Sequence, residues 1–168
     1  KINIIQGSEK NVYSRYKFFD DKKNYIILRI TADNPLVDPK LIDAFIRYFI
    51  SSKSDYLTTR AMCHSKRWKV KSDYPKGISL EIFYSKKLFI NDKKFNIKNQ
   101  ESPTWFFYNK KFPAKIDKFK SFGYYKKFKK NFSFTIDTQK DLTRLKKFIK
   151  KHNCTPGKNN FYKLCKSY

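Results

Sequence analysis

The feature that most constrains the fold is an apolar run that ends in a polar turn and is followed at once by a helix signal. Tyr25 to Ile30 is nearly continuous in apolar character, as expected for a strand of a parallel sheet that is buried on both faces. The polar turn Thr31 to Pro35 follows, and Pro39 then opens a helix. The apolar positions of this helix recur at three- and four-residue intervals, at Leu41, Ile42, Phe45, Ile46 and Phe49. This order of strand and helix favours an α/β fold over an all-β fold or a helical bundle.

The same alternation continues along the chain. Further strands are expected at Ile2 to Ile5, Asp55 to Thr58, Ile78 to Tyr84 and Phe132 to Ile136. Further helices are expected at Glu9 to Phe19, Ser85 to Ile90, Ser102 to Tyr108 and, capped by Thr138, Gln139 to Lys151. We therefore predict a mostly parallel sheet in one domain over residues 1–152, with a tail over residues 153–168. Residues 59–75 show no clear period and form either a lid over a site or a plain surface excursion.

The composition says more about the cellular compartment of the protein than about its binding partner. A net charge of +25 would suit nucleic acid, but Lys is scattered through every segment and is enriched together with Asn, Ile, Phe and Tyr, as AT-rich codon usage would produce. We therefore do not expect nucleic acid as a partner. The three cysteines lack C-x-x-C spacing and are interpreted as reduced thiols of a cytoplasmic protein. No apolar run approaches the roughly 18 residues of a membrane span.

Two aspartates stand out because each directly follows a predicted strand. Asp33 follows Tyr25 to Ile30, and Asp137 follows Phe132 to Ile136. Open α/β sheets bind their ligands at the carboxyl ends of the strands. Mg²⁺ is commonly held there by one or two carboxylates together with substrate phosphates, so the pair is a candidate metal platform. The alternative is that each aspartate only caps a turn or the following helix.

The turn around Asp33 also carries a specific motif. Residues 28–39 read LRITADNPLVDP and resemble the R-x-T-G-D-x-P-L-x-D-P motif of the cytidylyltransferases of spore-coat polysaccharide synthesis, relatives of CMP-sialic acid synthetases. Residues 7–16, GSEKNVYSRY, are similar to the family's G-S-x-x-D-V-x-x-R-Y. Residues 74–83, YPKGISLEIF, are similar to Y-P-x-G-x-x-x-E-x-F, and residues 134–138, FTIDT, to L-T-V-D-T. The four pieces occur in the family's order.

The resemblance implies a Rossmann-like nucleotide-diphospho-sugar transferase fold and an activity. Such an enzyme transfers CMP from CTP to an acidic sugar for cell-surface polysaccharide or glycan synthesis and releases pyrophosphate. By resemblance, Asp33 and Asp137 would bind the Mg²⁺ cofactor. The substrate contacts would come from Arg29, Tyr74, Gly77 and Glu81. Arg29 has an alternative reading as a strand residue paired to a surface acid, and Gly77 and Glu81 have alternative readings as a turn and a solvated strand residue. The partners are then CTP and the sugar, and a homodimer is allowed.

The chain departs from the family pattern in ways that bear on activity. Family members begin with a strand and a loop of the kind L-Q-A-R-x-x-S-x-R-L-P-G-K, which wraps the triphosphate, and nothing similar occurs in this sequence. Asn11 and Ser79 stand where Asp is common, and residues 100–104, QESPT, match R-E-H-V-T only loosely. We expect this segment to lack the first strand and the nucleotide loop and to be inactive alone. We also expect an exposed sheet edge beside Tyr25 to Ile30 or Ile2 to Ile5. A non-catalytic remnant or interaction domain that keeps the fold is the alternative.

Overall fold

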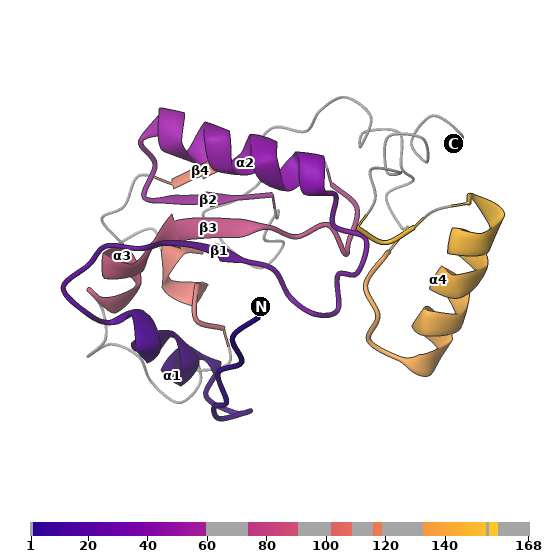
Figure 1. Cartoon of the computed structure of the whole chain (residues 1–168), viewed down its shortest axis with the longest axis horizontal. Coiled ribbons are helices and arrows are strands. Elements are labelled where there is room, and N and C mark those ends of the chain that lie inside the picture. The colour runs from indigo at the N-terminus through magenta and orange to yellow at the C-terminus, as the bar shows by residue number, and fades with distance from the viewer. Residues whose placement is uncertain are drawn as a thin grey trace.

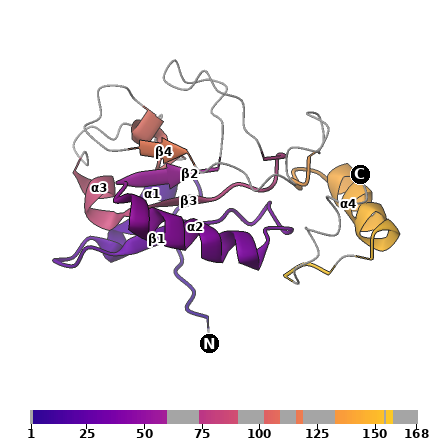
Figure 2. The ribbon, with the colours of Figure 1, turned by 90° about the horizontal axis from the view of Figure 1, so that it is seen from above.

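In the part of the chain that the structure describes, the core is a four-stranded sheet with helices on both faces (Figures 1 and 2). The computed structural model describes residues 2–59, 74–90, 102–108, 116–118, 133–153 and 155–157. The expected loop over residues 59–75 therefore lies almost wholly outside the described residues, as do the three cysteines and most of the expected tail.

The sheet has the order β1-β3-β2-β4. Its strands are β1 (Ile26–Arg29), β2 (Tyr56–Thr58), β3 (Glu81–Tyr84) and β4 (Ile116–Lys118). β3 is antiparallel to both β1 and β2, whereas β2 and β4 are parallel. The predicted α/β class is thus confirmed, and three of the described strands share one direction, but two of the three pairings are antiparallel rather than parallel. The antiparallel insertion of β3 and the existence of β4 were not predicted.

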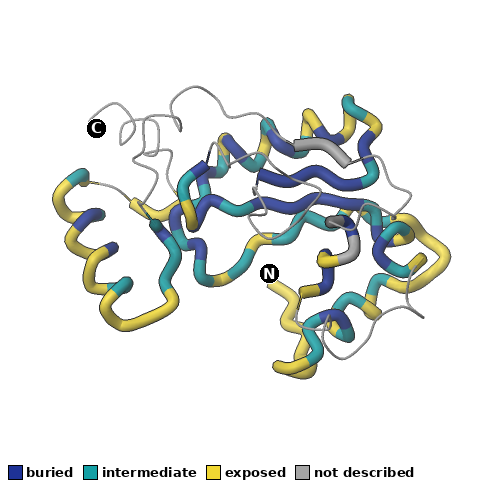
Figure 3. The backbone as a smooth tube through the Cα atoms, turned by 180° about the vertical axis from the view of Figure 1, so that it is seen from behind, coloured by how far each residue is buried: buried dark blue, intermediate teal, exposed yellow. Residues whose placement is uncertain are grey.

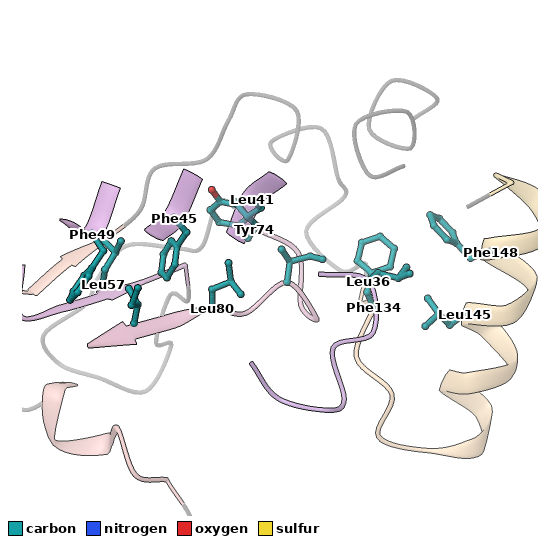
Figure 4. Close-up of a cluster of buried hydrophobic side chains, with 12 residues drawn as sticks. Leu36, Leu41, Phe45, Phe49, Leu57, Tyr74, Leu80, Phe134, Leu145 and Phe148 are labelled. Atoms are coloured by element: carbon teal, nitrogen blue, oxygen red, sulfur yellow. The ribbon is translucent and has the colours of Figure 1, made fainter. Parts of the chain in front are cut away.

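Each face of the sheet carries its own apolar cluster. Alternate strand residues Leu28, Leu57 and Ile82 face α2 (Pro39–Ser52), whose Phe45 and Phe49 are fully buried (Figure 4). The residues between them face the opposite layer, which holds α1 (Val12–Tyr16), η1 (Lys17–Phe19), α3 (Ser85–Phe89) and η4 (Trp105–Tyr108). The tube in Figure 3 is accordingly buried through β2 and β3 and more exposed on the surrounding helices.

The second face is built mainly from aromatic rings. The ring of Tyr56 stacks on that of Phe107, with 4.4 Å between centroids, and Phe83 lies 5.6 Å from the same Phe107 ring. Tyr13 and Leu88 complete this cluster. Such pairs add to area burial because ring edges and faces carry opposite partial charge. The Phe- and Tyr-rich composition is therefore used to cover a face of the sheet.

Local signals explain where α2 begins and ends. The Asp38 carboxylate accepts a hydrogen bond from the Lys40 backbone N–H at 2.9 Å, and Pro39 occupies the first helical position. Lys53 ends the helix in a left-handed conformation with φ of 51°. The predicted helix after Pro39 is confirmed with its apolar stripe.

Three strand predictions need correction. Ile2 to Ile5 forms no strand, and Ile2 and Ile4 are 90% and 87% exposed. β1 is not buried on both faces: it lies at an edge of the described sheet, its first residue Ile26 is 44% exposed, and Ile30, which follows it, is 41% exposed. Phe132 to Ile136 is not a strand in its described part, residues 133–136, where a single parallel bridge joins Ser133 to Lys76. A strand needs a partner ladder, which apolar character alone cannot supply.

The closing helix α4 (Gln139–Lys151) packs beyond the carboxyl end of β1 (Figures 1 and 2). Its buried residues Leu145 and Phe148 meet Phe134 and Leu36 in the cluster of Figure 4. A capping box starts it: the Thr138 hydroxyl accepts from the Asp141 N–H, and the Asp141 carboxylate accepts from the Thr138 N–H at 3.0 Å. The Thr138 hydroxyl also donates a hydrogen bond to the Asp141 carboxylate. This hydrogen bond is the main reason why the pKa of Asp141 is lowered.

Replacing Thr138 with Ala is expected to lower the free energy of unfolding by about 1 kcal/mol, because the Asp141 N–H loses its acceptor. Urea unfolding followed by circular dichroism measures this. Thr143→Ala is the matched control, since Thr143 lies inside α4 and its hydroxyl donates to the Gln139 carbonyl of the preceding turn. Equal stability of the two variants would contradict the capping role.

Candidate functional site

The candidate site lies where β1 and β2 end and β3 begins. Arg29, the last residue of β1, is in register with Glu81, the first residue of β3, and Thr58 at the end of β2 pairs with the same Glu81. The turn that carries Asp33 leaves from this edge. Binding sites of open α/β sheets are found at such carboxyl ends.

The Asp33 turn is held by its neighbours. The Asn34 N–H donates to the Thr31 carbonyl at 3.1 Å, and the Asn34 side-chain amide donates to the Thr31 hydroxyl at 2.7 Å. Asn34 is buried, which fixes the turn against the core. The Asp33 Oδ1 atom is itself buried and has no hydrogen-bond partner within the described ranges. A buried oxygen without a partner is costly unless a ligand satisfies it.

The backbone joins the Asp33 turn to the segment of Asp137. The Ile136 N–H donates to the Asp33 carbonyl at 3.0 Å, which places the residue before Asp137 directly on this turn. Asp137 is exposed, immediately before the N-cap of α4. In the described part of the chain no three His, Cys, Asp or Glu side chains gather as a metal cluster. Mg²⁺ bound to a nucleotide needs only one or two protein carboxylates, so the orphaned Asp33 oxygen and the neighbouring Asp137 fit such an ion.

Gly77 and Tyr74 have structural surroundings. The Phe134 N–H donates to the Lys76 carbonyl at 2.8 Å, and Gly77 has a φ of +88°. A Cβ on Gly77 would lie 2.5 Å from the backbone of Phe134 and of Thr135, so only glycine fits. Tyr74 is 6% exposed within the α2-side apolar cluster.

Glu81 is the centre of a buried polar network. It is 1% exposed, and its Oε2 atom pairs with Arg29 Nη1. Its Oε1 atom accepts hydrogen bonds from the Tyr56 hydroxyl at 2.6 Å and from the Thr104 hydroxyl at 2.9 Å. The Tyr16 hydroxyl lies close enough to the Arg29 guanidinium for each group to shift the pKa of the other. The network thus joins α1, β1, β2, β3 and the residue before η4.

The charges in this network compensate one another. Burial alone lowers the pKa of Arg29, but the Glu81 carboxylate and the nearby Tyr16 outweigh it, so the net pKa is raised. Burial and the Glu81 charge raise the pKa of Tyr16, partly opposed by Arg29. Arg29 therefore stays protonated and Tyr16 neutral near pH 7, and the positive charge of Arg29 is already neutralised by Glu81.

The predicted site residues thus fall into two groups. Asp33 and Asp137 belong to segments in direct backbone contact, while Arg29 and Glu81 bind each other. The substrate contacts of Arg29, Tyr74, Gly77 and Glu81 remain a prediction. Sequence reasoning did not single out three members of the network, namely Tyr16, Tyr56 and Thr104. The available signal was position, because Tyr16 closes the GSEKNVYSRY motif and Thr104 closes QESPT.

An α/β sheet with an aspartate turn at the carboxyl end of β1, joined by a backbone hydrogen bond to a second aspartate segment, is an arrangement suited to a nucleotide with its metal ion. Comparison with known proteins makes the class specific: a family model described as Cytidylyltransferase matches residues 2–163. The chain belongs to the cytidylyltransferase family, and the predicted enzyme class is confirmed. In the described part of the chain, no helix has the length and apolar character needed to cross a membrane.

One solved structure and two curated proteins are similar to this chain. A cytidylyltransferase structure from Leptospira borgpetersenii aligns with 93% of this chain at a TM-score of 0.69 and 21% identity, which confirms the fold; the chain covers 61% of that structure. An uncharacterised protein of Methanocaldococcus jannaschii is 40% identical over 62 residues, 35% of this chain and 25% of the relative. The spore coat polysaccharide biosynthesis protein SpsF of Bacillus subtilis is 39% identical over 56 residues, 33% of this chain and 23% of the relative.

Proposed function

We propose that this chain is part of an enzyme that transfers CMP from CTP to an acidic sugar, in the cytoplasm, as a step of cell-surface polysaccharide synthesis, and that this segment is inactive alone. The observation that carries the proposal is the contact between the Asp33 turn and the segment that leads into Asp137, in a chain of the cytidylyltransferase family. The similarity to a spore coat polysaccharide biosynthesis protein supports the pathway class. The acidic sugar and the choice of CTP come from the motif resemblance.

The chemistry needs few reactive side chains. A hydroxyl of the sugar attacks the α-phosphorus of CTP in line, the bond to the β-phosphate oxygen breaks, and pyrophosphate leaves. Mg²⁺ held by Asp33 and Asp137 would neutralise the charge that builds on the phosphate oxygens. The Thr31–Asn34 hydrogen bonds brace the turn that carries Asp33, and the Ile136 N–H joins the residue before Asp137 to this turn. Positioning and electrostatics therefore make up most of the protein's contribution.

Pyrophosphate release tests the proposal. Two proteins are compared: the chain, and a longer version that adds a Gly- and Arg-containing nucleotide loop in front of it. Each is given CTP, UTP or ATP as the nucleotide substrate. Each is assayed with a nine-carbon acidic sugar or its neutral analogue. We expect the longer version to release pyrophosphate only with Mg²⁺ and CTP. We also expect it to prefer the acidic sugar at least about 10-fold, because a site built to bind a charged group discriminates against an analogue that lacks this group.

The other outcomes are equally informative. Equal rates with the neutral sugar would contradict the acidic substrate, and equal rates with UTP would contradict CTP. Turnover in EDTA would contradict the metal platform. Absence of turnover by the longer version under all conditions would favour the alternative, an interaction domain that keeps the fold.

A further inference from the structure

We infer that Glu81 is a positioning residue, which holds the Asp33 turn in place through Arg29 without touching substrate. The inference rests on the proposed function, because it assigns Glu81 a task in a reaction whose charged centre is the Asp33 carboxylate. It also explains the presence of a buried network whose residues take no direct part in the chemical step. Four residues converge on Glu81 directly or through Arg29, namely Tyr16, Arg29, Tyr56 and Thr104.

The geometry fixes Glu81 firmly. Both of its carboxylate oxygens are engaged, one by Arg29 and the other by two hydroxyls, and the residue is 1% exposed. The hydroxyls come from Tyr56 in β2 and from Thr104, the residue before η4, so Glu81 cannot shift without breaking several bonds. A buried carboxylate with all its partners in place is rigid.

From Glu81 the constraint passes along a short path. Arg29 is the last residue of β1, so its ion pair pins the strand end from which the Asp33 turn departs. The turn is compact because Asn34 bonds back to Thr31 twice. The Asp33 carbonyl then receives the Ile136 N–H. Each step is a hydrogen bond or a peptide link, so a displacement of Arg29 would be passed on to the Asp33 turn.

Stability alone explains this network poorly. A buried ion pair gives little net stability over apolar side chains of similar volume, because desolvation offsets the attraction between the charges. The neighbouring positions of the same face are filled with Phe83, Phe107 and Leu88, so apolar packing was available there. What an ion pair adds is a defined orientation, and here the oriented group ends at the edge that carries the two aspartates.

Amide hydrogen exchange on the full chain tests the inference. In Glu81→Gln the side chain keeps its volume and one acceptor oxygen but loses the charge that holds Arg29. We expect the N–H groups of Asn34 and Ile136 to exchange at least about 10-fold faster, because they close the Asp33 turn. The N–H groups of Ile42 and Leu142, which lie in the first turns of α2 and α4, should stay within about twofold of the parent.

Two further variants sharpen the test. Arg29→Lys keeps the charge but loses the planar fork, and it should show the same selective pattern; it also decides the question if Glu81→Gln fails to fold. Asp55→Asn is the matched control, since it removes the Asp55–Lys87 pair, which belongs to the other end of the sheet. Exchange at Asn34 and Ile136 should be unchanged in it.

The outcomes separate the two proposals. Faster exchange at all four amides would make Glu81 a general stabilising residue, and unchanged exchange at Asn34 and Ile136 would remove the path; either result overturns the inference. A Mn²⁺ titration of the parent and of Asp33→Asn is the second arm. If the parent does not bind Mn²⁺, the metal platform of the proposed function fails, while the exchange data still decide whether Glu81 holds the turn.

Discussion

Replacing Asp33 with Asn is expected to lower kcat/KM for pyrophosphate release by at least about 100-fold, or roughly 3 kcal/mol of transition-state stabilisation. The amide has nearly the shape of the carboxylate but lacks its charge, and the buried Oδ1 atom would no longer attract a cation. Asp137→Asn should have a loss of similar size. Steady-state kinetics of the longer version with the nucleotide loop measure both.

The control for charge removal is Asp43→Asn. Asp43 is exposed on α2 and belongs to neither the Asp33 turn nor the segment of Asp137. Its rate should stay within about twofold of the parent, as expected for a surface substitution. Near-normal turnover in Asp33→Asn or in Asp137→Asn would remove that residue from the mechanism, because a required ion cannot be held equally well by a neutral amide.

Replacing Gly77 with Ala should destabilise the protein by about 3 to 5 kcal/mol, the range of substitutions that combine backbone strain with a clash. The added methyl group would lie 2.5 Å from the backbone of Phe134 and Thr135 in a conformation with φ of +88°. The backbone must therefore move, and the hydrogen bond from Phe134 to Lys76 with it. Urea or thermal unfolding measures the change.

Gly157→Ala separates the two causes of this effect. Gly157 has a similar φ of +76°, but a Cβ there meets no atom of the described chain within 4 Å. Only the left-handed conformation is penalised, by about 1 to 2 kcal/mol. If Gly77→Ala were no more destabilising than Gly157→Ala, the close approach of Phe134 would have no energetic weight, and Gly77 would be free to serve the substrate instead.

The helices could be predicted because their signals are local. Asp38 and Pro39 start α2, and Thr138 starts α4, within a turn of the residues they affect. The strands were harder, since pairing depends on residues far apart in sequence. Nothing near β1 shows that its neighbour is the antiparallel β3 rather than β2. An apolar pattern likewise could not show that Ile2 to Ile5 has no ladder in this structure.

The same distinction divides the site. Asp33 and Asp137 could be located from short contiguous motifs, and their two segments do meet through Ile136. The pairing of Arg29 with Glu81 required the register of two strands, so motif reading assigned both residues to the substrate. A charged residue inside an apolar strand is ambiguous in this way, because a buried partner and a ligand present the same sequence pattern.

The place of β3 between β1 and β2 has a consequence for how the chain acquires its structure. In β1, Ile26 pairs with Tyr84, and in β2, Tyr56 pairs with Phe83. Both partners lie in β3, which is synthesised after β1 and β2. Until β3 leaves the ribosome, two apolar segments have open hydrogen-bonding edges. Long-range pairing of this kind slows folding and leaves nascent chains prone to associate with one another. Slower synthesis or added chaperone should therefore raise the yield of soluble protein more than is usual for a protein of this modest size.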